Sequence, residues 1–285
     1  MTVLAISPHL DDAAFSAGGA LATAVAAGHT VVVVSVFTQS VPHPTGFALR
    51  CQTDKGIGPE TDYMALRRAE DTIACERIGA EHLWLDLPEA PHRGYDSAES
   101  LFAGIRADDR GIWEDVRDAL APVFEEREPD LVLSCQGLGS HVDHLLTARA
   151  VEALTESMQE MTSWWRDQPY ALRDPAAVRA PSLPAGLREV GLPLTVEALT
   201  VKLDACAAYT SQLPYQFGGG ETDDAATGDA ATGETDPSGA EAMREQLAAF
   251  AGAEGARFGF KLPAEAFVTG HPNAWRRLWD VTPLS

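Results

Sequence analysis

The sequence predicts an α/β fold with a Rossmann-like, mostly parallel sheet, helices on both faces and a C-terminal elaboration. Short β-branched runs alternate with amphipathic stretches through the first half of the chain, which is the pattern of βαβ units. Two of the predicted strands end in clusters of histidine and aspartate. The chain of 285 residues is long enough for one such domain with additional C-terminal segments.

The individual elements follow from local signals. Gly28 is a natural C-cap for the first helix, and Pro129 ends the third. Residues 39–61 and 88–107 carry too many prolines and glycines for regular structure, and the first of these loops is long enough to be functional. Residues 164–194 are poorly periodic. The predicted strands are 3–7, 30–37, 82–87 and 130–135, and the predicted helices are 15–28, 62–78, 108–126, 141–161 and 195–209.

Composition divides the chain into three parts. Residues 1–217 carry the Rossmann-like pattern, and residues 241–285 predict a C-terminal extension that packs on the same domain. Residues 218–240 are acidic, of low complexity and almost free of large apolar groups. Because such a segment cannot bury apolar surface, it predicts a disordered insertion at the surface.

Charge and hydropathy exclude several classes of partner. The net charge of −21 repels nucleic acid and anionic membranes, so neither is an expected partner. No apolar run approaches the length of a membrane span, and the N-terminus lacks the basic and apolar regions of a signal peptide. We therefore expect a cytoplasmic protein that binds small molecules, and leave open whether it forms a homo-oligomer. The four cysteines form no CxxC pair, which favours free thiols.

Two motifs carry the chemistry. Residues 7–12 read Ser-Pro-His-Leu-Asp-Asp, and residues 140–144 read Ser-His-Val-Asp-His. Each motif follows an apolar strand, where open α/β sheets bind their ligands. Alone, the first motif could be a helix N-cap and the second a solvated helix start. Together they supply the two histidines and one carboxylate of a hydrolytic zinc site, plus an acid and an imidazole that suit amide hydrolysis.

These motifs resemble those of the PIG-L/LmbE-like deacetylase family, whose hallmarks are PHxDD at a strand end and a later HxDH. Residues 67–70, Arg-Arg-Ala-Glu, followed by Ile-Gly at 78–79, resemble the family's Arg-x-x-Glu helix. Lys202 with residues 209–212, Tyr-Thr-Ser-Gln, is similar to its Lys…Tyr-x-Ser-Gln segment. The resemblance spans residues 2 to about 217 and implies a deacetylase domain over 1–217. There is no G-x-G-x-x-G after the first strand, which argues against a dinucleotide enzyme.

The resemblance implies a role for seven residues. It makes His9, Asp12 and His144 the ligands of Zn²⁺ and Asp11 the general base. It makes His141 the residue that provides electrostatic or acid catalysis, held in place by Asp143. It also implies that Arg67 contacts a sugar hydroxyl, and a salt bridge on the helix surface is the alternative for Arg67.

Two departures from the family pattern leave the substrate open. Several members have a tyrosine two residues before the first histidine of HxDH, proposed to help the oxyanion, and this chain has Gly139 there. Leu10 replaces a common proline. The aromatic residues Trp164, Trp165 and Tyr170 could wall a sugar pocket or pack in the core.

The expected activity is zinc-dependent removal of an N-acetyl group from a GlcNAc-containing small molecule or glycoside. One alternative is a zinc amidase for another N-acyl amine, for instance in antibiotic or thiol-conjugate metabolism. Another is an inactive sugar- or nucleotide-binding module on the same fold. A broken set of metal ligands would indicate the inactive module, and here the set is complete.

Overall fold

A seven-stranded mixed sheet forms the centre of the computed structural model, which describes residues 1–156, 161–218, 237–270, 272, 275 and 279. The strand order is β3-β2-β1-β4-β5-β7-β6. Strands from β3 to β5 run parallel, whereas β7 is antiparallel to both of its neighbours. The strands are β1 Thr2–Ser7, β2 Thr30–Ser35, β3 Glu81–Trp84, β4 Leu131–Cys135, β5 Thr162–Trp165, β6 Arg188–Pro193 and β7 Ala264–Thr269.

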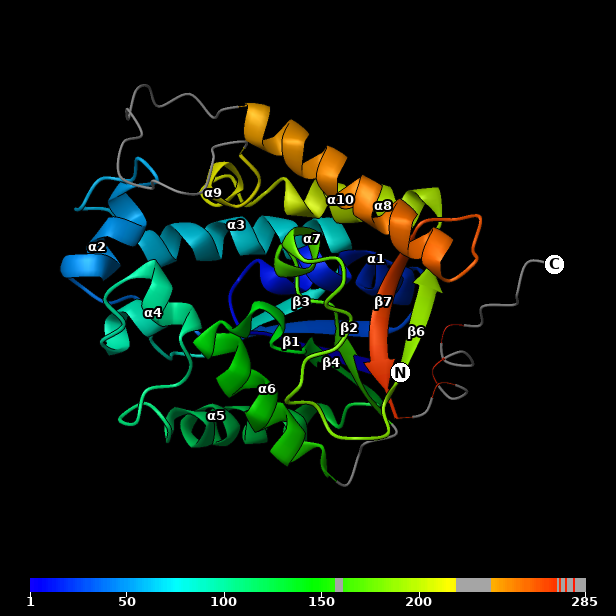
Figure 1. The fold of residues 1–285 in the computed structure, drawn as a ribbon, viewed down its shortest axis with the longest axis horizontal. Coiled ribbons are helices and arrows are strands. Elements are labelled where there is room, and N and C mark those ends of the chain that lie inside the picture. The colour runs from blue at the N-terminus through cyan, green and yellow to red at the C-terminus, as the bar shows by residue number, and fades with distance from the viewer. Residues whose placement is uncertain (157–160, 219–236, 271, 273–274, 276–278, 280–285) are drawn as a thin grey trace.

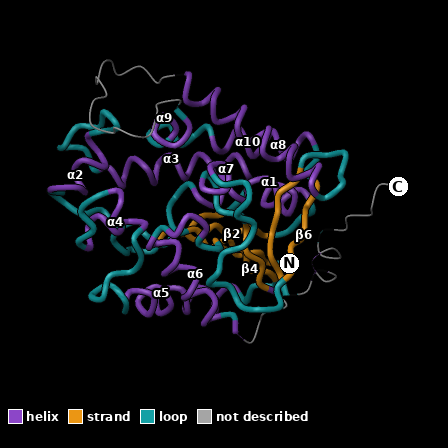
Figure 2. Tube along the Cα trace, viewed as in Figure 1, coloured by secondary structure: helices purple, strands orange, loops and turns teal. Residues whose placement is uncertain are grey.

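Helices cover both faces of this sheet (Figure 1). Helices α1, α3, α8 and α10 lie on one side, and α5 and α6 lie on the other. The tube view shows the strands enclosed between these two helical layers (Figure 2). None of the helices in the described part of the chain is long and apolar enough to cross a bilayer. The helices are α1 Asp12–Ala26, α2 Gly46–Thr53, α3 Tyr63–Ile78, η1 Ala90–Arg93, α4 Ala98–Phe102, α5 Ile112–Arg127, η2 Leu138–Ser140, α6 Val142–Leu154, α7 Tyr170–Arg173, α8 Val196–Cys206, α9 Leu213–Phe217 and α10 Pro237–Arg257.

The topology places a ligand crevice between β1 and β4. From β1 the chain proceeds to β2 and β3 on one side, and it then returns to add β4 on the other side of β1. The loops that leave the carboxyl ends of β1 and β4 therefore diverge, which opens a crevice at this edge of the sheet. Both predicted motifs begin in these two loops.

Helix α1 packs unusually close to its neighbours because its sequence is rich in alanine and glycine. A Cβ atom at Gly19 would lie 2.5 Å from Cδ1 of Leu194, and one at Gly18 would lie 3.1 Å from Cγ of Lys202. On the same helix, the Phe15 ring packs edge-on against Tyr209 and Phe217. The small residues thus let α8 approach the helix that carries Asp12.

The predicted fold class is confirmed, and several local predictions need correction. The loop predicted over 39–61 contains α2, and the loop predicted over 88–107 contains η1 and α4. The third strand ends at Trp84 rather than at residue 87. The poorly periodic stretch 164–194 contains α7 and β6. These elements are short, so their formation depends more on tertiary contacts than on local periodicity.

The C-terminal part of the chain contributes both a strand and a helix to the fold. Strand β7 lies within the sheet, between β5 and β6. Helix α10 begins at Pro237, so residues 237–240 are helical and do not belong to the predicted disordered insertion. The remainder of that prediction, residues 219–236, lies outside the described residues. The four cysteines are free, as predicted, and three of them are buried.

Candidate metal centre and active site

The turn between β1 and α1 is fixed by the hydroxyl of Ser7. Its Oγ donates to the His9 carbonyl oxygen at 2.5 Å and accepts from the Ala13 amide at 3.0 Å. Asp11 is the N-cap residue of α1, and Asp12 is the first residue of the helix. The Asp12 carboxylate accepts the His9 amide at 2.8 Å. These bonds direct the His9 and Asp12 side chains into the crevice beside β4.

The turn between β4 and α6 uses left-handed backbone. Gly137 and Gly139 have φ of 82° and 80°, and Ser140 has φ of 66°. His141 then caps α6, since its Nδ1 accepts the Asp143 amide at 3.2 Å. His144 lies in the first turn of the helix and is fully buried. The glycines thus allow the chain to reverse sharply and to present both histidines at the end of β4.

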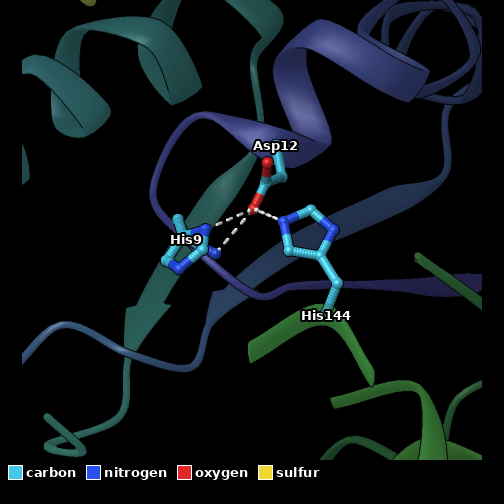
Figure 3. Close-up of side chains that lie close together, drawn as sticks. All are labelled: His9, Asp12 and His144. Atoms are coloured by element: carbon cyan, nitrogen blue, oxygen red, sulfur yellow. Dashed lines mark hydrogen bonds and ion pairs between the residues drawn. The ribbon is translucent and has the colours of Figure 1, made fainter. Parts of the chain in front are cut away.

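The two turns bring His9, Asp12 and His144 together (Figure 3). Asp12 Oδ2 lies 3.1 Å from His9 Nδ1 and 3.2 Å from His144 Nε2. The three side chains can each offer one ligand atom, and these atoms lie within 4.8 Å of one another. Two imidazoles and one carboxylate form a donor set that suits a borderline divalent cation such as zinc.

The His144 ring provides a test of whether a cation fits. Its Nδ1 lies 2.9 Å from Asp167 Oδ1, so this nitrogen donates and leaves the Nε2 lone pair facing Asp12. Nε2 is buried and has no hydrogen-bond partner within the described chain. A lone pair and a carboxylate oxygen at this distance repel each other, so the arrangement is favourable only when a proton or a cation lies between them.

The pKa values of the three side chains also indicate that positive charge is needed beside Asp12. Burial lowers the pKa of His144, but the charge of Asp12 and the bond to Asp167 outweigh it and raise the pKa to about 9. The pKa of His9 is likewise raised by Asp12 despite burial. Burial raises the pKa of Asp12, and the two histidines then bring it well below its usual value. The buried Asp12 carboxylate therefore requires positive charge beside it, which a metal ion bound here would supply in place of these protons.

Asp167 is a residue of the centre that the sequence analysis missed. It is fully buried just after β5. Its Oδ2 accepts the amides of Gln136 and Leu138 at 3.0 and 3.1 Å, while its Oδ1 accepts from His144. A carboxylate that orients a metal-binding histidine in this way is a common companion of zinc sites. The signal for it in the sequence was weak, because β5, Thr162–Trp165, is short and half polar and was not among the predicted strands.

The Asp143 carboxylate has partners other than the predicted one. It was expected to hold His141, but only its backbone amide contacts that ring. The carboxylate lies 3.1 Å from His9 Nε2, accepts the Ala90 amide at 3.0 Å and pairs with Arg93 at 2.7 Å. These donors outweigh the effect of burial and keep the pKa of Asp143 far below its usual range. Asp143 therefore orients His9, on the side opposite to Asp12.

Asp11 lies next to these residues, against Arg67. Asp11 is buried, and its Oδ1 is 3.4 Å from the Arg67 guanidinium, which also pairs with Glu89. Burial raises the pKa of Asp11, while the Arg67 charge opposes this shift. Arg67 is only 5% exposed, so the alternative of a helix-surface salt bridge is wrong. The arginine is buried and paired with the predicted base.

His141 lies between the His9 ring and the end of α4. Its ring is 5.0 Å from the His9 ring and 5.4 Å from the exposed ring of Phe102, measured between centroids. Burial, and then the positive charge of His9, lower the pKa of His141 to about 3. Because Nδ1 accepts an amide proton, the neutral ring carries its own proton on Nε2. Of the candidate aromatic residues, Trp164 and Trp165 are core residues, whereas Tyr170 lies beside His144.

The two later segments of the resemblance have structural partners. Glu70 accepts from the Thr210 and Ser211 hydroxyls and from the Ser211 amide, which fastens α3 to the segment after α8. Lys202 forms a buried ion pair with Glu265 of β7 at 2.7 Å. Both segments therefore support the helices that surround the site.

A cavity of about 250 Å³ lies outside the histidine cluster, and none of the candidate metal ligands lines it. The predicted functional loop and the start of α3 line most of it, and His92 of η1 completes the lining. The next residue of η1, Arg93, pairs with Asp143 of the centre. Helix η1 therefore contacts both the cavity and Asp143, but the cavity itself is separate from the histidine cluster.

The sequence model of the PIG-L family, described as GlcNAc-PI de-N-acetylase, matches residues 4–155. A curated relative, the 2'-N-acetylparomamine deacetylase of Streptomyces fradiae, is 33% identical over 169 residues, which cover 59% of this chain and 57% of the relative. The chain therefore matches little more than half the length of that protein.

Solved structures of deacetylases match over nearly the whole chain. A deacetylase of the teicoplanin biosynthesis pathway, in complex with bog, has a TM-score of 0.76 and 26% identity, covering 94% of this chain and 97% of its own. The zinc-inhibited form of the teicoplanin deacetylase Orf2 has a TM-score of 0.74 at 26% identity, with the same coverage. The family match and these relatives show that the chain belongs to the PIG-L (GlcNAc-PI de-N-acetylase) family, as its two motifs predict.

Proposed function

We propose that this protein is a metal-dependent hydrolase that removes the N-acetyl group from an amino sugar within a small molecule. The observation that supports this most is the position of Asp12 Oδ2 between His9 Nδ1 and His144 Nε2, with a second buried carboxylate, Asp11, on the adjacent residue. A cation site with a neighbouring base is what hydrolysis of an unactivated amide requires. The relatives named above are deacetylases, which agrees with this chemistry.

His9, Asp12 and His144 would hold the metal, and zinc is the ion we propose. Their donor atoms match the two-histidine, one-carboxylate set of many hydrolytic zinc sites. When bound, the ion supplies a Lewis acid that polarises the amide carbonyl and acidifies water. Asp143 and Asp167 would hold the two imidazoles in the tautomers that leave their inward nitrogens free for the ion.

The remaining residues have roles set by their contacts. Asp11 would take the proton of the attacking water and return it to the leaving nitrogen, and burial suits it for this because a raised pKa makes a carboxylate a better base. Arg67 would hold Asp11 in place through its ion pair. The Nε2 proton of His141 would be donated to the substrate. The contact of Arg67 with a sugar hydroxyl stays a prediction.

The proposed substrate class is an N-acetylated amino sugar carried by a larger small molecule. Support comes from the relatives, one of which is a deacetylase of 2'-N-acetylparomamine and another a deacetylase of teicoplanin biosynthesis. The excess of negative charge on this chain disfavours strongly anionic substrates. A glycoside or glycoconjugate that is neutral or cationic fits both considerations.

The proposal is tested with protein purified without chelators. Metal analysis should give about one transition-metal ion per chain, and release of acetate should be measured on N-acetylglucosamine, its glycosides and 2'-N-acetylparomamine. Because one relative was solved in a zinc-inhibited form, zinc is added back only to one equivalent. Metal-dependent acetate release supports the proposal. Hydrolysis confined to other N-acyl amines would favour the broader amidase, and sugar binding without hydrolysis would favour the inactive module.

A further inference from the structure

Two aromatic rings, those of Tyr170 and Phe102, lie beside the histidines of the second motif. The Tyr170 ring, at the start of α7, lies edge-on to the His144 ring with centroids 5.4 Å apart. It also contacts the ring of Phe102, at 5.9 Å, and Phe102 in turn lies against His141. Tyr170 is thus held between the histidines of the second motif and the exposed end of α4, and it is only partly buried.

The Tyr170 ring occupies the space that a side chain at position 139 would need. A Cβ atom on Gly139 would lie 2.6 Å from both Cγ and Cδ1 of Tyr170. Gly139 also has φ of 80°, which disfavours any other residue. The absence of a side chain two residues before His141 therefore makes room for an aromatic ring contributed from a position 31 residues later in the chain.

The backbone before Tyr170 is fastened to the centre. Asp167 accepts from His144 and from two amides of the turn that contains Gly137. The Gln168 amide donates to Ser16 Oγ of α1 at 3.0 Å, and the Ala171 amide donates to the Asp167 carbonyl at 2.8 Å. These bonds tie the start of α7 to both motif-bearing elements, so the position of the Tyr170 ring is set by the same contacts that set His144.

The Tyr170 hydroxyl differs from those of the other enclosed tyrosines. Tyr95 and Tyr209 donate to Asp109 and Asp71, at 3.0 and 2.8 Å, and the Tyr63 hydroxyl accepts from Lys55. Within the described part of the chain, the Tyr170 hydroxyl has no hydrogen-bond partner, and it is not sealed from solvent. A phenol is protonated at neutral pH, so this group is a hydrogen-bond donor without a described partner, on a ring that packs against His144.

We propose that Tyr170 is a catalytic residue that donates its phenolic hydrogen bond to the oxygen of the tetrahedral intermediate. This inference rests on the proposed amide hydrolysis. As water adds to the carbonyl carbon, its proton passes to Asp11 and the C=O π pair moves to oxygen, where Tyr170 stabilises the charge. When the C=O bond re-forms, the C–N bond breaks and the proton moves from Asp11 to the amine. Donors aimed at such an oxygen are among the strongest contributors to acyl-transfer catalysis.

The test compares Tyr170→Phe with the wild type and with Tyr215→Phe, a tyrosine that is 56% exposed on α9. On the best substrate of the panel, Tyr170→Phe should lower kcat about 10²-fold, the usual effect of losing one such donor, with KM unchanged. The Tyr215→Phe control should retain the wild-type values. Metal content and melting temperature should stay unchanged in both variants, because the Tyr170 hydroxyl bonds to no described group.

A second substrate distinguishes a donor from a packing residue. The trifluoroacetyl analogue of the same substrate carries less charge on its oxyanion, so Tyr170→Phe should reduce its hydrolysis less than it reduces that of the acetyl compound. Wild-type kcat in Tyr170→Phe, an equal loss on both substrates or a loss of metal would each overturn the role of Tyr170 while leaving the proposed hydrolysis intact. Failure of the wild type to release acetate from any substrate would overturn both.

Discussion

The carboxylate of Asp143 lies 3.1 Å from His9 Nε2, although the two residues are 134 positions apart in sequence. His144 has the equivalent relationship with Asp167, at 2.9 Å. Each candidate metal-binding imidazole therefore has one nitrogen directed to Asp12 and the other directed to a buried carboxylate. The two carboxylates set the orientation and the tautomer of the two rings.

Asp143→Asn should weaken metal binding. One carboxylate oxygen accepts from Arg93, and the other accepts from His9 and from the Ala90 amide. An amide at this position would turn its NH₂ group toward one of these donors. We expect metal affinity to fall by about 10- to 100-fold, measured by competition with a chromophoric chelator. Asp108→Asn is the control, since Asp108 is exposed in a surface ion pair. Unchanged affinity in Asp143→Asn would contradict the orienting role.

Asp167→Asn should destabilise the protein even without metal. Oδ2 accepts from two buried backbone amides, and Oδ1 accepts from His144. Asn has only one acceptor oxygen, so it cannot satisfy both sets of donors. The free energy of unfolding in urea should fall by about 1–3 kcal/mol, the cost of leaving a buried donor unpaired. Asp174→Asn, at an exposed position, should change stability little. Equal stability of the two variants would show that the turn after β4 does not depend on Asp167.

Substitution of Asp12 should reduce metal affinity, whereas substitution of Asp11 should reduce the reaction rate. Asp12→Ala removes the carboxylate that faces both histidines and should lower metal affinity by about an order of magnitude or more. Asp11→Asn keeps the shape of the residue but removes the proton acceptor, so it should retain metal and lose about 10²- to 10⁴-fold in rate. Both variants are assayed for metal and acetate release in one buffer. Metal loss in Asp11→Asn with retention in Asp12→Ala would reverse the two assignments.

Asp71 should make the protein less stable as pH rises. Burial raises the pKa of Asp71 to about 7, although the Trp84 indole and the Tyr209 hydroxyl donate to it and oppose the shift. Between its unfolded pKa and pH 7 the folded state binds more protons than the unfolded state, so this group costs stability progressively and the full cost is present above pH 7.

Asp71→Asn tests that pH dependence. Relative to the wild type, the variant should gain about 2–3 kcal/mol of unfolding free energy between pH 5 and pH 8, because it removes the ionisation, whereas the loss of one of the two oxygen acceptors costs the same at both pH values. The measurement is urea unfolding of both proteins at each pH. If the unfolding free energy of the variant instead fell relative to that of the wild type toward pH 8, the folded state would stabilise the ionised form of Asp71.

The sequence by itself determined where the chemistry lies. Apolar runs identified β1 and β4, and each was followed directly by histidine and aspartate. Because parallel strands in an open sheet end at a common edge, it followed that the two motifs meet. The helix predicted over 62–78 was also found, as Tyr63–Ile78, because Asp62 and Gly79 cap its two ends through bonds between near neighbours. These features depend on contacts local in sequence or on a general rule of topology.

Only the tertiary structure decided which distant groups complete the site. The pairing of Asp143 with His9, the bond from His144 to Asp167 and the placement of Tyr170 in the space above Gly139 all join segments whose relative positions depend on loop packing. The insertion of β7 between β5 and β6 is of the same kind. No periodicity or local propensity encodes such contacts, because their free energy arises from burial and hydrogen bonding between surfaces that meet only after the sheet has formed.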